Sequence, residues 1–382
     1  MEAIRSDNFT PNEDVLAVAL ELSGKCWKVG LQDEKHERPA IYSLYDEQAA
    51  ARLAHVVAVI EESKKKWNLP TTITVAVMYE AGQDGFWICR ALSKLGYRAM
   101  VVDPASIPVE RHARRAKTDR LDVIRLLGSL RGWVRGEFGR MHVVRVPAPE
   151  AEALRQLPRD RGQLQKEVGQ HRDRIRKLLR TVGYWEAVGA NFASRLADGQ
   201  IRCYDGSPLP AQLEQRISRE CERLAQVEAQ LAALEKSLLS QLAPPVRERI
   251  ATLARLKGVG QVGAMRLVLE LFWRRFDNRR QVGSCVGLVP QPYDSGNSRV
   301  DQGISKQGNR RVRALLIEMA WLWLRYQPDS ALARWFAQRT AGNATNKRGK
   351  RLAIVAVARK LTIALWRYLD SGVLPEGGAM KT

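Results

Sequence analysis

The chain has 382 residues, of which 45% are hydrophobic and 27% charged, an ordinary balance for a globular protein with two or three cored domains. Its charge is unusual, because 62 lysines and arginines against 41 acidic residues give a net charge of +21. This excess makes a polyanion the expected partner. Nucleic acid fits best, since no single basic amphipathic helix dominates as binding to a membrane surface would require.

Cysteine usage and hydropathy exclude several other classes. Five dispersed cysteines, none in a C-x-x-C pair, argue against a disulfide framework or a zinc knuckle and favour a reducing compartment. The N-terminal segment has no apolar run and is not expected to act as a signal peptide. The longest apolar stretches, 314–324 and 352–369, contain charged residues and cannot span a bilayer. We therefore expect a cytoplasmic protein with no membrane partner.

The first part of the chain alternates strand and helix patterns. Helices are expected from Asp46 onward and over 84–95. Strands are expected at 15–23, 26–32, 39–44, 71–79 and 97–102. The first three strands can form a meander, and helices alternate with strands after it. This order predicts an α/β domain with a mixed sheet.

The middle of the chain has apolar residues at 4,3 spacing in two long segments, 157–178 and 217–238. They flank a loop region at 183–210, so we expect an antiparallel helical hairpin or a dimerising coiled coil. His171 on the first seam is interpreted as a tolerated core residue. Beyond Pro244 the chain is predicted to be mainly helical, apart from a loop-like segment at 283–308 that is rich in Gly, Pro, Asn and Ser.

Four acidic residues could form one site: Glu21, Glu80, Asp119 and Asp122. Glu21 lies in an apolar strand, and Glu80 follows the strand 71–79 at the end where α/β sheets present functional groups. The i, i+3 spacing of Asp119 and Asp122 puts both on one helix face. Carboxylates that meet repel one another unless divalent cations neutralise them, and paired metals promote phosphodiester chemistry. The set predicts a site for Mg²⁺ or Mn²⁺.

Each acid alone also has a plain structural explanation. Glu21 could be a protective charge on an edge strand, and Glu80 an ordinary loop acid. The two aspartates could pair on a solvated helix with three neighbouring cations, Arg115, Lys117 and Arg120. Taken together, the four acids favour the metal site. Three other acids are rival ligands: Asp14, Asp84 and Asp103, of which Asp103 is the strongest because it ends a strand.

Segment 253–271 reads as a helix, a turn at Gly258-Val259-Gly260, and another helix. In a helix-hairpin-helix such glycines let backbone N–H groups approach a phosphate without reading its sequence. A plain turn between helices explains the pattern equally well.

Segment 287–321 combines a loop serine with a basic helix start. Ser295 becomes a nucleophile only if a neighbour accepts its proton or a cation stabilises its alkoxide, and no histidine is near. A Ser-Gly pair is otherwise a turn. Arginines in a first helical turn oppose the helix dipole unless a phosphate binds there. The residues expected to contact nucleic acid are Arg115, Lys117, Gly258, Gly260, Arg299, Lys306, Arg310, Arg311 and Arg313.

These motifs, in this order, resemble the insertion-sequence-110 transposases, and within them the insertion-sequence-1111 branch. The resemblance rests on RAKTDRLD at 115–122, YEAG at 79–82 and GLVP…SG…ISKQGNRRVR at 287–313. It implies a RuvC-like, RNase H-fold domain with a DEDD carboxylate tetrad. Glu80, Asp119 and Asp122 match the last three members, and Glu21 stands where the family usually has aspartate.

The resemblance also implies a catalytic serine, which matches Ser295, in a bacterial, nucleoid-associated enzyme. It further implies donor and target DNA as substrates, a structured non-coding bridge RNA as guide, and a homodimer or homotetramer that shares its sites between subunits. The expected domains are a RuvC-like domain (1–148), a helical coiled-coil region (149–245) and a mainly helical transposase domain (246–382). Two alternatives stay open: a RuvC-like nuclease that uses water, and a non-enzymatic nucleic-acid-binding protein.

Overall fold

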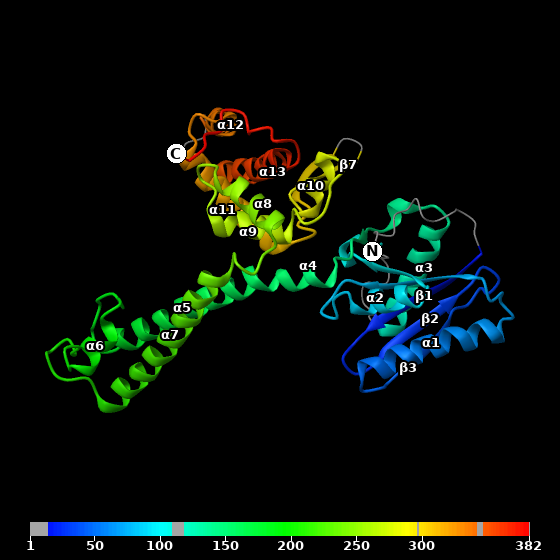
Figure 1. Ribbon diagram of the computed structural model, residues 1–382, viewed down its shortest axis with the longest axis horizontal. Helices are drawn as coiled ribbons and strands as arrows, with labels where there is room; N and C mark the ends of the chain where they lie inside the picture. Colours follow the sequence, from blue (N-terminus) through cyan, green and yellow to red (C-terminus); the bar gives the residue numbers. More distant parts are fainter. Residues whose placement is uncertain (1–13, 109–117, 296–297, 342–346, 382) are drawn as a thin grey trace. The chain divides into compact units, whose positions relative to one another are not determined.

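The computed structural model describes residues 14–108, 118–295, 298–341 and 347–381 (Figure 1). The chain divides into two compact units, Met1–Ala148 and Pro149–Thr382, and each is described by itself. The division into three domains that the sequence suggests stays a prediction. Within the described ranges, every helix is too short or too polar to serve as a membrane span.

The first unit is built on a six-stranded sheet with the order β3-β2-β1-β4-β5-β6. β1 runs antiparallel to β2 and parallel to β4, and β2 runs antiparallel to β3. The predicted meander and mixed sheet are therefore confirmed. The strands are β1 (Val15–Leu22), β2 (Trp27–Gln32), β3 (Ala40–Leu44), β4 (Thr74–Glu80), β5 (Arg98–Val102) and β6 (Val143–Val144). The short strand β6 was not expected from the sequence.

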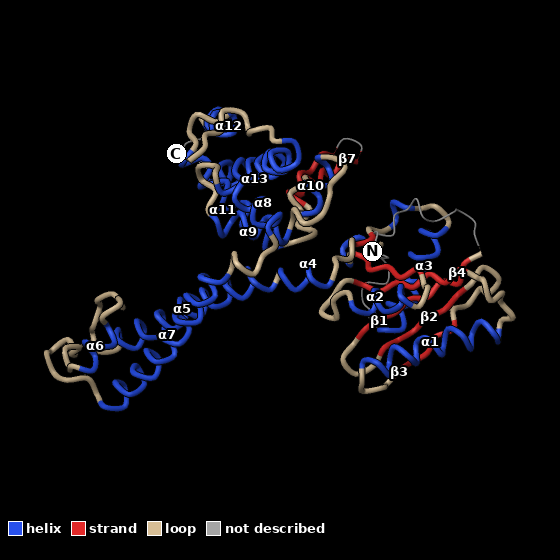
Figure 2. The backbone as a smooth tube through the Cα atoms, in the orientation of Figure 1, coloured by secondary structure: helices blue, strands red, loops and turns tan. Residues whose placement is uncertain are grey.

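Helices cover both faces of this sheet, as the alternation of side chains along β1 requires. Leu16, Val18 and Leu20 face a core shared with α1 (Ala49–Lys66) and α2 (Trp87–Lys94). The intervening Ala17 and Ala19 face a second core shared with α3 (Asp119–Val134). Figure 2 shows the strands enclosed between these helices. Because both faces are covered, β1 and β4 are almost continuously apolar.

Gly30 on β2 lets α3 approach the sheet closely. A Cβ atom at this position would overlap Val123 Cγ1 and lie 2.8 Å from Leu127 Cδ1. At its N-terminus α3 is capped by the Thr118 hydroxyl, which accepts a hydrogen bond from Leu121 N at 3.3 Å. Packing and cap together fix the height of the first turn of α3 above the sheet.

The second unit begins with two long helices that form an antiparallel hairpin, α5 (Gln156–Arg180) and α7 (Ala211–Ser237) (Figure 1). Ion pairs between the two helices show the direction, because partner numbers fall along α7 as they rise along α5. These pairs are Arg161–Glu235 at 2.6 Å, Arg172–Glu228 at 2.6 Å and Arg174–Glu220 at 3.3 Å. The apolar seams therefore pack within one chain, and a coiled coil between subunits stays a prediction.

The segment at the far end of this hairpin is only partly a loop, since it contains α6 (Phe192–Ala197) with a small core of its own. Buried Phe192 and Leu196 join Ile175 and Leu179 of α5 in that core. His171 is buried against Glu220, in line with a core position.

The rest of the second unit is mainly helical, as expected. Its helices besides α4 (Pro149–Leu154) are α8 (Pro244–Ala254), α9 (Gln261–Glu270), α10 (Arg279–Cys285), α11 (Arg310–Tyr326), α12 (Ala331–Thr340) and α13 (Lys347–Ser371). Trp323, Leu361 and Leu365 are completely buried among them. The expectation of a loop over 283–308 is wrong, because this segment ends α10 and then forms an antiparallel pair, β7 (Pro290–Ser295) and β8 (Ser298–Ile304).

Residues 379–381 bind to the turn that follows α8. Lys257 N donates a hydrogen bond to Ala379 O at 3.0 Å. The Lys381 ammonium donates to Ala254 O at 2.6 Å and to Val259 O at 2.8 Å. This contact holds the turn between α8 and α9 in one conformation.

Gly30→Ala tests the close packing of α3. The added methyl group must displace Val123 and Leu127, so we expect a loss of about 1–3 kcal/mol in the free energy of unfolding. Urea unfolding of the full chain measures it. Gly24→Ala is the matched control, because nothing lies within 4 Å of a Cβ there and its change should stay within about 0.5 kcal/mol. Equal losses in the two variants would contradict the packing.

Candidate functional site

The ends of two adjacent parallel strands bring Glu21 and Glu80 together. The register pairs Leu20 of β1 with Tyr79 of β4, and each glutamate is the next residue along its strand. Side-chain alternation places Glu21 on the same face as Ala19, and Glu80 on the same face as Met78. That face is the one covered by α3. Glu80 is the last residue of β4, not the first residue after a strand as the sequence suggested.

The first turn of α3 adds Asp122 to this corner of the sheet. Asp122 is buried, and its Oδ1 lies 2.9 Å from Nη2 of Arg125. The same Nη2 lies 3.7 Å from Oε1 of Glu80. One guanidinium is therefore shared between a carboxylate of α3 and a carboxylate of β4, so these two acids face a common cation.

Asp119 lies one turn earlier, as the first residue of α3, and is exposed. Its position at a helix N-terminus suits a carboxylate, because the helix dipole is positive there. Among the residues that the structure describes, no three acidic, histidine or cysteine side chains lie close enough together to enclose a metal. Magnesium, however, is usually held by only one or two carboxylates together with phosphate oxygens and water, and the donors of Glu80 and Asp122 fit that pattern.

The rival acids occupy other positions. Asp14 immediately precedes β1, at the opposite end of that strand from Glu21. Asp103 accepts a hydrogen bond from Ala105 N at 3.0 Å and caps the short helix η2 (Pro104–Ser106). Asp84 lies in the turn between β4 and α2. Asp14 and Asp103 thus have positions or partners that do not depend on a metal.

Sequence reasoning missed Arg125, although it follows Asp122 at the i+3 spacing of helical ion pairs. Its Nε atom is buried without a hydrogen-bond partner among the described residues. A cation fixed beside the carboxylates lowers their mutual repulsion, which allows the first turn of α3 to pack near the end of β4.

Ser295 is the last residue of β7 and is paired with Ser298 across the hairpin. It therefore ends a strand instead of lying in an open loop. The side chains of Ser295 and Arg299 lie outside the part that the structure describes, as do Arg115 and Lys117 entirely.

The start of α11 holds three of the predicted basic residues. Arg310 and Arg311 are exposed. Arg313 is half-buried and donates to Val286 O at 3.1 Å and to Gln307 O at 2.9 Å, and its burial lowers the pKa of its guanidinium. It therefore fixes the chain between α10 and α11. Lys306, just before this helix, adopts a positive φ of 57° and is exposed.

The two glycines of the proposed helix-hairpin-helix serve different purposes. Gly258 has a φ of +79°, and a Cβ there would lie 3.2 Å from Leu322 O, so the turn packs directly on α11. Gly260 is the N-cap of α9. Because glycine has no side chain, it cannot accept a hydrogen bond from the first N–H groups of this helix. The geometry suits a structural turn, and phosphate binding at this turn stays a prediction.

Two family models match the chain. The one described as "Transposase IS116/IS110/IS902 family" matches residues 250–334, and a DEDD transposase model of the IS110 type matches residues 31–183. Glu80, Asp119 and Asp122 lie within the second match and Ser295 lies within the first. Glu21 lies outside both.

Several curated proteins are similar to it. A putative transposase, y4rJ, of Sinorhizobium fredii is 40% identical over 96% of this chain and 94% of that one. The transposase for insertion sequence element IS1533 of Leptospira borgpetersenii is 26% identical over 73% of this chain and 78% of its own length. The transposase for insertion sequence element IS1111A of Coxiella burnetii is 32% identical over 30% of this chain and 31% of its own length.

Replacing Asp119 and Asp122 one at a time by asparagine distinguishes the contribution of the exposed acid to stability from that of the buried acid. Asp122→Asn removes the charge that faces the partly buried Arg125, so we expect a loss of about 1–3 kcal/mol in the free energy of unfolding. Asp119→Asn should change it by less than about 1 kcal/mol, because that side chain is exposed. Urea unfolding measures both, and equal losses would contradict the assignment of Arg125 to Asp122.

Proposed function

Because this chain belongs to the IS116/IS110/IS902 family of transposases and is therefore a DNA transposase, we propose that it cleaves and rejoins the DNA of an insertion sequence with Mg²⁺ or Mn²⁺ at its carboxylates and Ser295 as nucleophile. The observation that carries the metal site is the convergence of Glu80, at the end of β4, and Asp122, in the first turn of α3, whose carboxylates lie 3.7 and 2.9 Å from one nitrogen of Arg125.

We assign the metal-binding role to Glu21, Glu80, Asp119 and Asp122. The match to a DEDD transposase model suggests the use of a divalent metal. A bound divalent cation would stabilise the charge on the attacking and leaving oxygens of a phosphodiester. Three features support this assignment: the two glutamates share one face of the sheet, Asp122 lies near the same guanidinium as Glu80, and Asp119 precedes Asp122 in the first turn of α3. Glu21 is longer than the aspartate usual in the family, so its reach differs by one methylene.

In this proposal Ser295 Oγ forms a bond to the phosphorus of a DNA phosphate, while the bond from that phosphorus to a deoxyribose oxygen breaks. The proton that the serine loses balances the proton that the departing oxygen takes up. The phosphodiester is conserved as a protein–DNA ester, so a hydroxyl of another DNA end can reverse the step and rejoin the strands. The exposed Arg310 and Arg311 that follow in the chain would stabilise phosphate charge.

We also propose that a structured non-coding RNA selects the donor and target DNA, and that a homodimer or homotetramer is the working form. Support comes from the sequence resemblance and from the net charge of +21, which suits two nucleic acids as partners. The α5–α7 seam packs within one chain, with Leu224 buried, and contact of this hairpin with another subunit stays part of the proposal.

Asp119→Asn tests the carboxylates. The amide keeps the size of the side chain but removes charge that attracts the cation, so cleavage of cognate DNA in Mg²⁺ should fall by at least about 100-fold while the fold is retained. Glu34→Gln is the control, since Glu34 is exposed and pairs with Arg135 elsewhere in this unit. Full activity of Asp119→Asn would show that Asp119 is not one of the metal-binding residues.

Ser295→Ala tests the nucleophile. Serine attack leaves a protein–DNA adduct that survives denaturation, whereas attack by water leaves free ends. We expect the adduct on a denaturing gel with the unmodified protein and none with Ser295→Ala, which should still bind DNA. Ser298→Ala and Ser305→Ala are controls and should keep the adduct. Normal cleavage and rejoining by Ser295→Ala would favour a water-dependent nuclease instead.

A further inference from the structure

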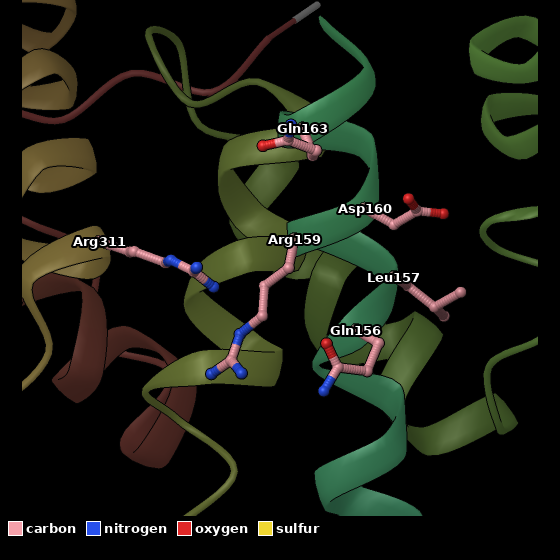
Figure 3. Close-up of a pocket in the computed structure, with 6 residues that line it drawn as sticks. All are labelled: Gln156, Leu157, Arg159, Asp160, Gln163 and Arg311. Carbon is pink, nitrogen blue, oxygen red and sulfur yellow. The ribbon is translucent and has the colours of Figure 1, made fainter. Parts of the chain in front are cut away.

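A groove runs between α5 and the start of α11 in the second unit (Figure 3). Its volume is about 540 Å³. We call it the α5–α11 groove, and its lining residues are Gln156, Leu157, Arg159, Asp160 and Gln163 of α5 and Arg311 of α11. None of the groove residues on α5 was predicted as functional, and all of the groove residues belong to the second unit, whereas the four carboxylates belong to the first.

The polar groups of the groove are mostly hydrogen-bond donors. Figure 3 shows the guanidinium groups of Arg159 and Arg311 turned toward the same space from opposite sides. The amides of Gln156 and Gln163 lie on that side of α5, whereas the carboxylate of Asp160 points to the other side. An anion between the two helices would therefore meet two cations and two amides.

Behind the groove, the base of α5 carries more positive charge than its acids balance. Arg155 is only 9% exposed, and its guanidinium carbon lies 4.2 Å from the centre of the Trp273 ring. Arg274 lies 4.8 Å from the same ring. Burial and the nearby charges of Arg274 and Arg159 lower the pKa of Arg155 to about 10. A buried guanidinium in such surroundings is stabilised by an added anion.

Several of these donors have no acceptor among the described residues. They are Nε and Nη2 of Arg155, Nε of Arg159 and Nε of Arg274. The nearest buried acid is Glu270, whose Oε2 lies 3.8 Å from Arg159 Nη2 and already accepts a hydrogen bond from Asn309 at 3.0 Å. Glu152 and Glu270 both raise the pKa of Arg155, but burial and the neighbouring arginines outweigh them, and unsatisfied buried donors are costly.

We propose that the α5–α11 groove is a binding site for phosphate groups of a nucleic-acid backbone, held between Arg159 and Arg311. Guanidinium groups form paired hydrogen bonds with phosphate oxygens, and the two glutamine amides can donate to the same group. The site reads no sequence, since it contacts only the backbone. This inference rests on the proposed function in one respect, that the protein binds nucleic acid. It adds a contact that joins the helical hairpin to the helix following the Ser295 hairpin.

The test is the salt dependence of binding for the double variant Arg159→Gln/Arg311→Gln. Each phosphate contact that is lost lowers the slope of log affinity against log salt by about 1, so the double variant should lose about 2. Its affinity at fixed salt should fall roughly tenfold for each arginine, equally for unrelated sequences. Fluorescence anisotropy of the full chain with a labelled duplex DNA, and separately with a labelled stem-loop RNA, measures both quantities.

The matched control is Arg176→Gln/Arg325→Gln, which removes the same charge from the same two helices. Arg176 pairs with Asp173 on the exposed side of α5, and Arg325 lies against Tyr326 at the far end of α11. Arg159→Gln alone is the second variant, because Arg159 lines the groove and has no assigned role beside Ser295, whereas Arg311 has both roles. It should lower the slope by about 1. The inference is overturned if both groove variants keep the slope and affinity of the control.

The two nucleic acids distinguish the source of the phosphate. If the slope of log affinity against log salt falls only with DNA, the groove binds substrate DNA. If it falls only with RNA, the groove binds a guide RNA. If it falls with both, the two nucleic acids share the groove. All measurements are made in EDTA, so they do not depend on the carboxylates or on Ser295. Loss of cleavage or of the adduct therefore tests the proposed reaction, and the slope measured for Arg159→Gln tests the groove, because Arg159 has no assigned role in that reaction.

Discussion

The packing of α3 against the sheet determines where the acidic residues of the first unit lie. The absence of a side chain at Gly30 allows Val123 and Leu127 to approach β2, and buried residues of α3 complete the core on that face. This packing fixes the first turn of α3 over the ends of β1 and β4. Asp122 is buried there because α3 packs on the sheet, and the tendency of the segment to form a helix would not by itself bury it.

Such packing brings like charges together, and the protein offsets their repulsion internally. Arg125 is close to both Asp122 and Glu80, so it neutralises part of their charge. The base of α5 is the opposite case, because the positive charges of Arg159 and Arg274 lower the pKa of buried Arg155 more than Glu152 and Glu270 raise it. In the first unit, then, two acids share one arginine, and at the base of α5 clustered arginines exceed the charge of the acids near them. This contrast agrees with the two proposals made above, a metal site in the first unit and a phosphate site in the second.

Much of the first unit was predictable, because its strands are short apolar runs that are bounded by residues typical of turns. The acids Glu80, Asp119 and Asp122 could be singled out because each stands at the end of an element. Arg125 was missed because its importance depends on Glu80, which is distant in sequence.

The second unit was less predictable where contacts are distant. The β7–β8 hairpin was read as a loop, since Pro290 and Pro292 are unfavourable in most strands and an isolated hairpin has few contacts to reveal it. The α5–α11 groove could not be inferred at all, because nothing local in either helix shows that Arg159 and Arg311 face each other. Patterns in a sequence report the elements well, but they do not report which distant faces meet.

The contact between residues 379–381 and the turn after α8 has a consequence for how this unit folds. Lys381 and Val259 are 122 positions apart, so their hydrogen bond closes a very large loop. The entropy of closing such a loop is recovered only after the intervening helices have packed. We therefore expect the contact between Lys381 and this turn to form late in folding. The turn should stay ordered only while the helices between Val259 and Lys381 remain packed. Hydrogen exchange at this turn would then report the cooperative opening of the whole helical core.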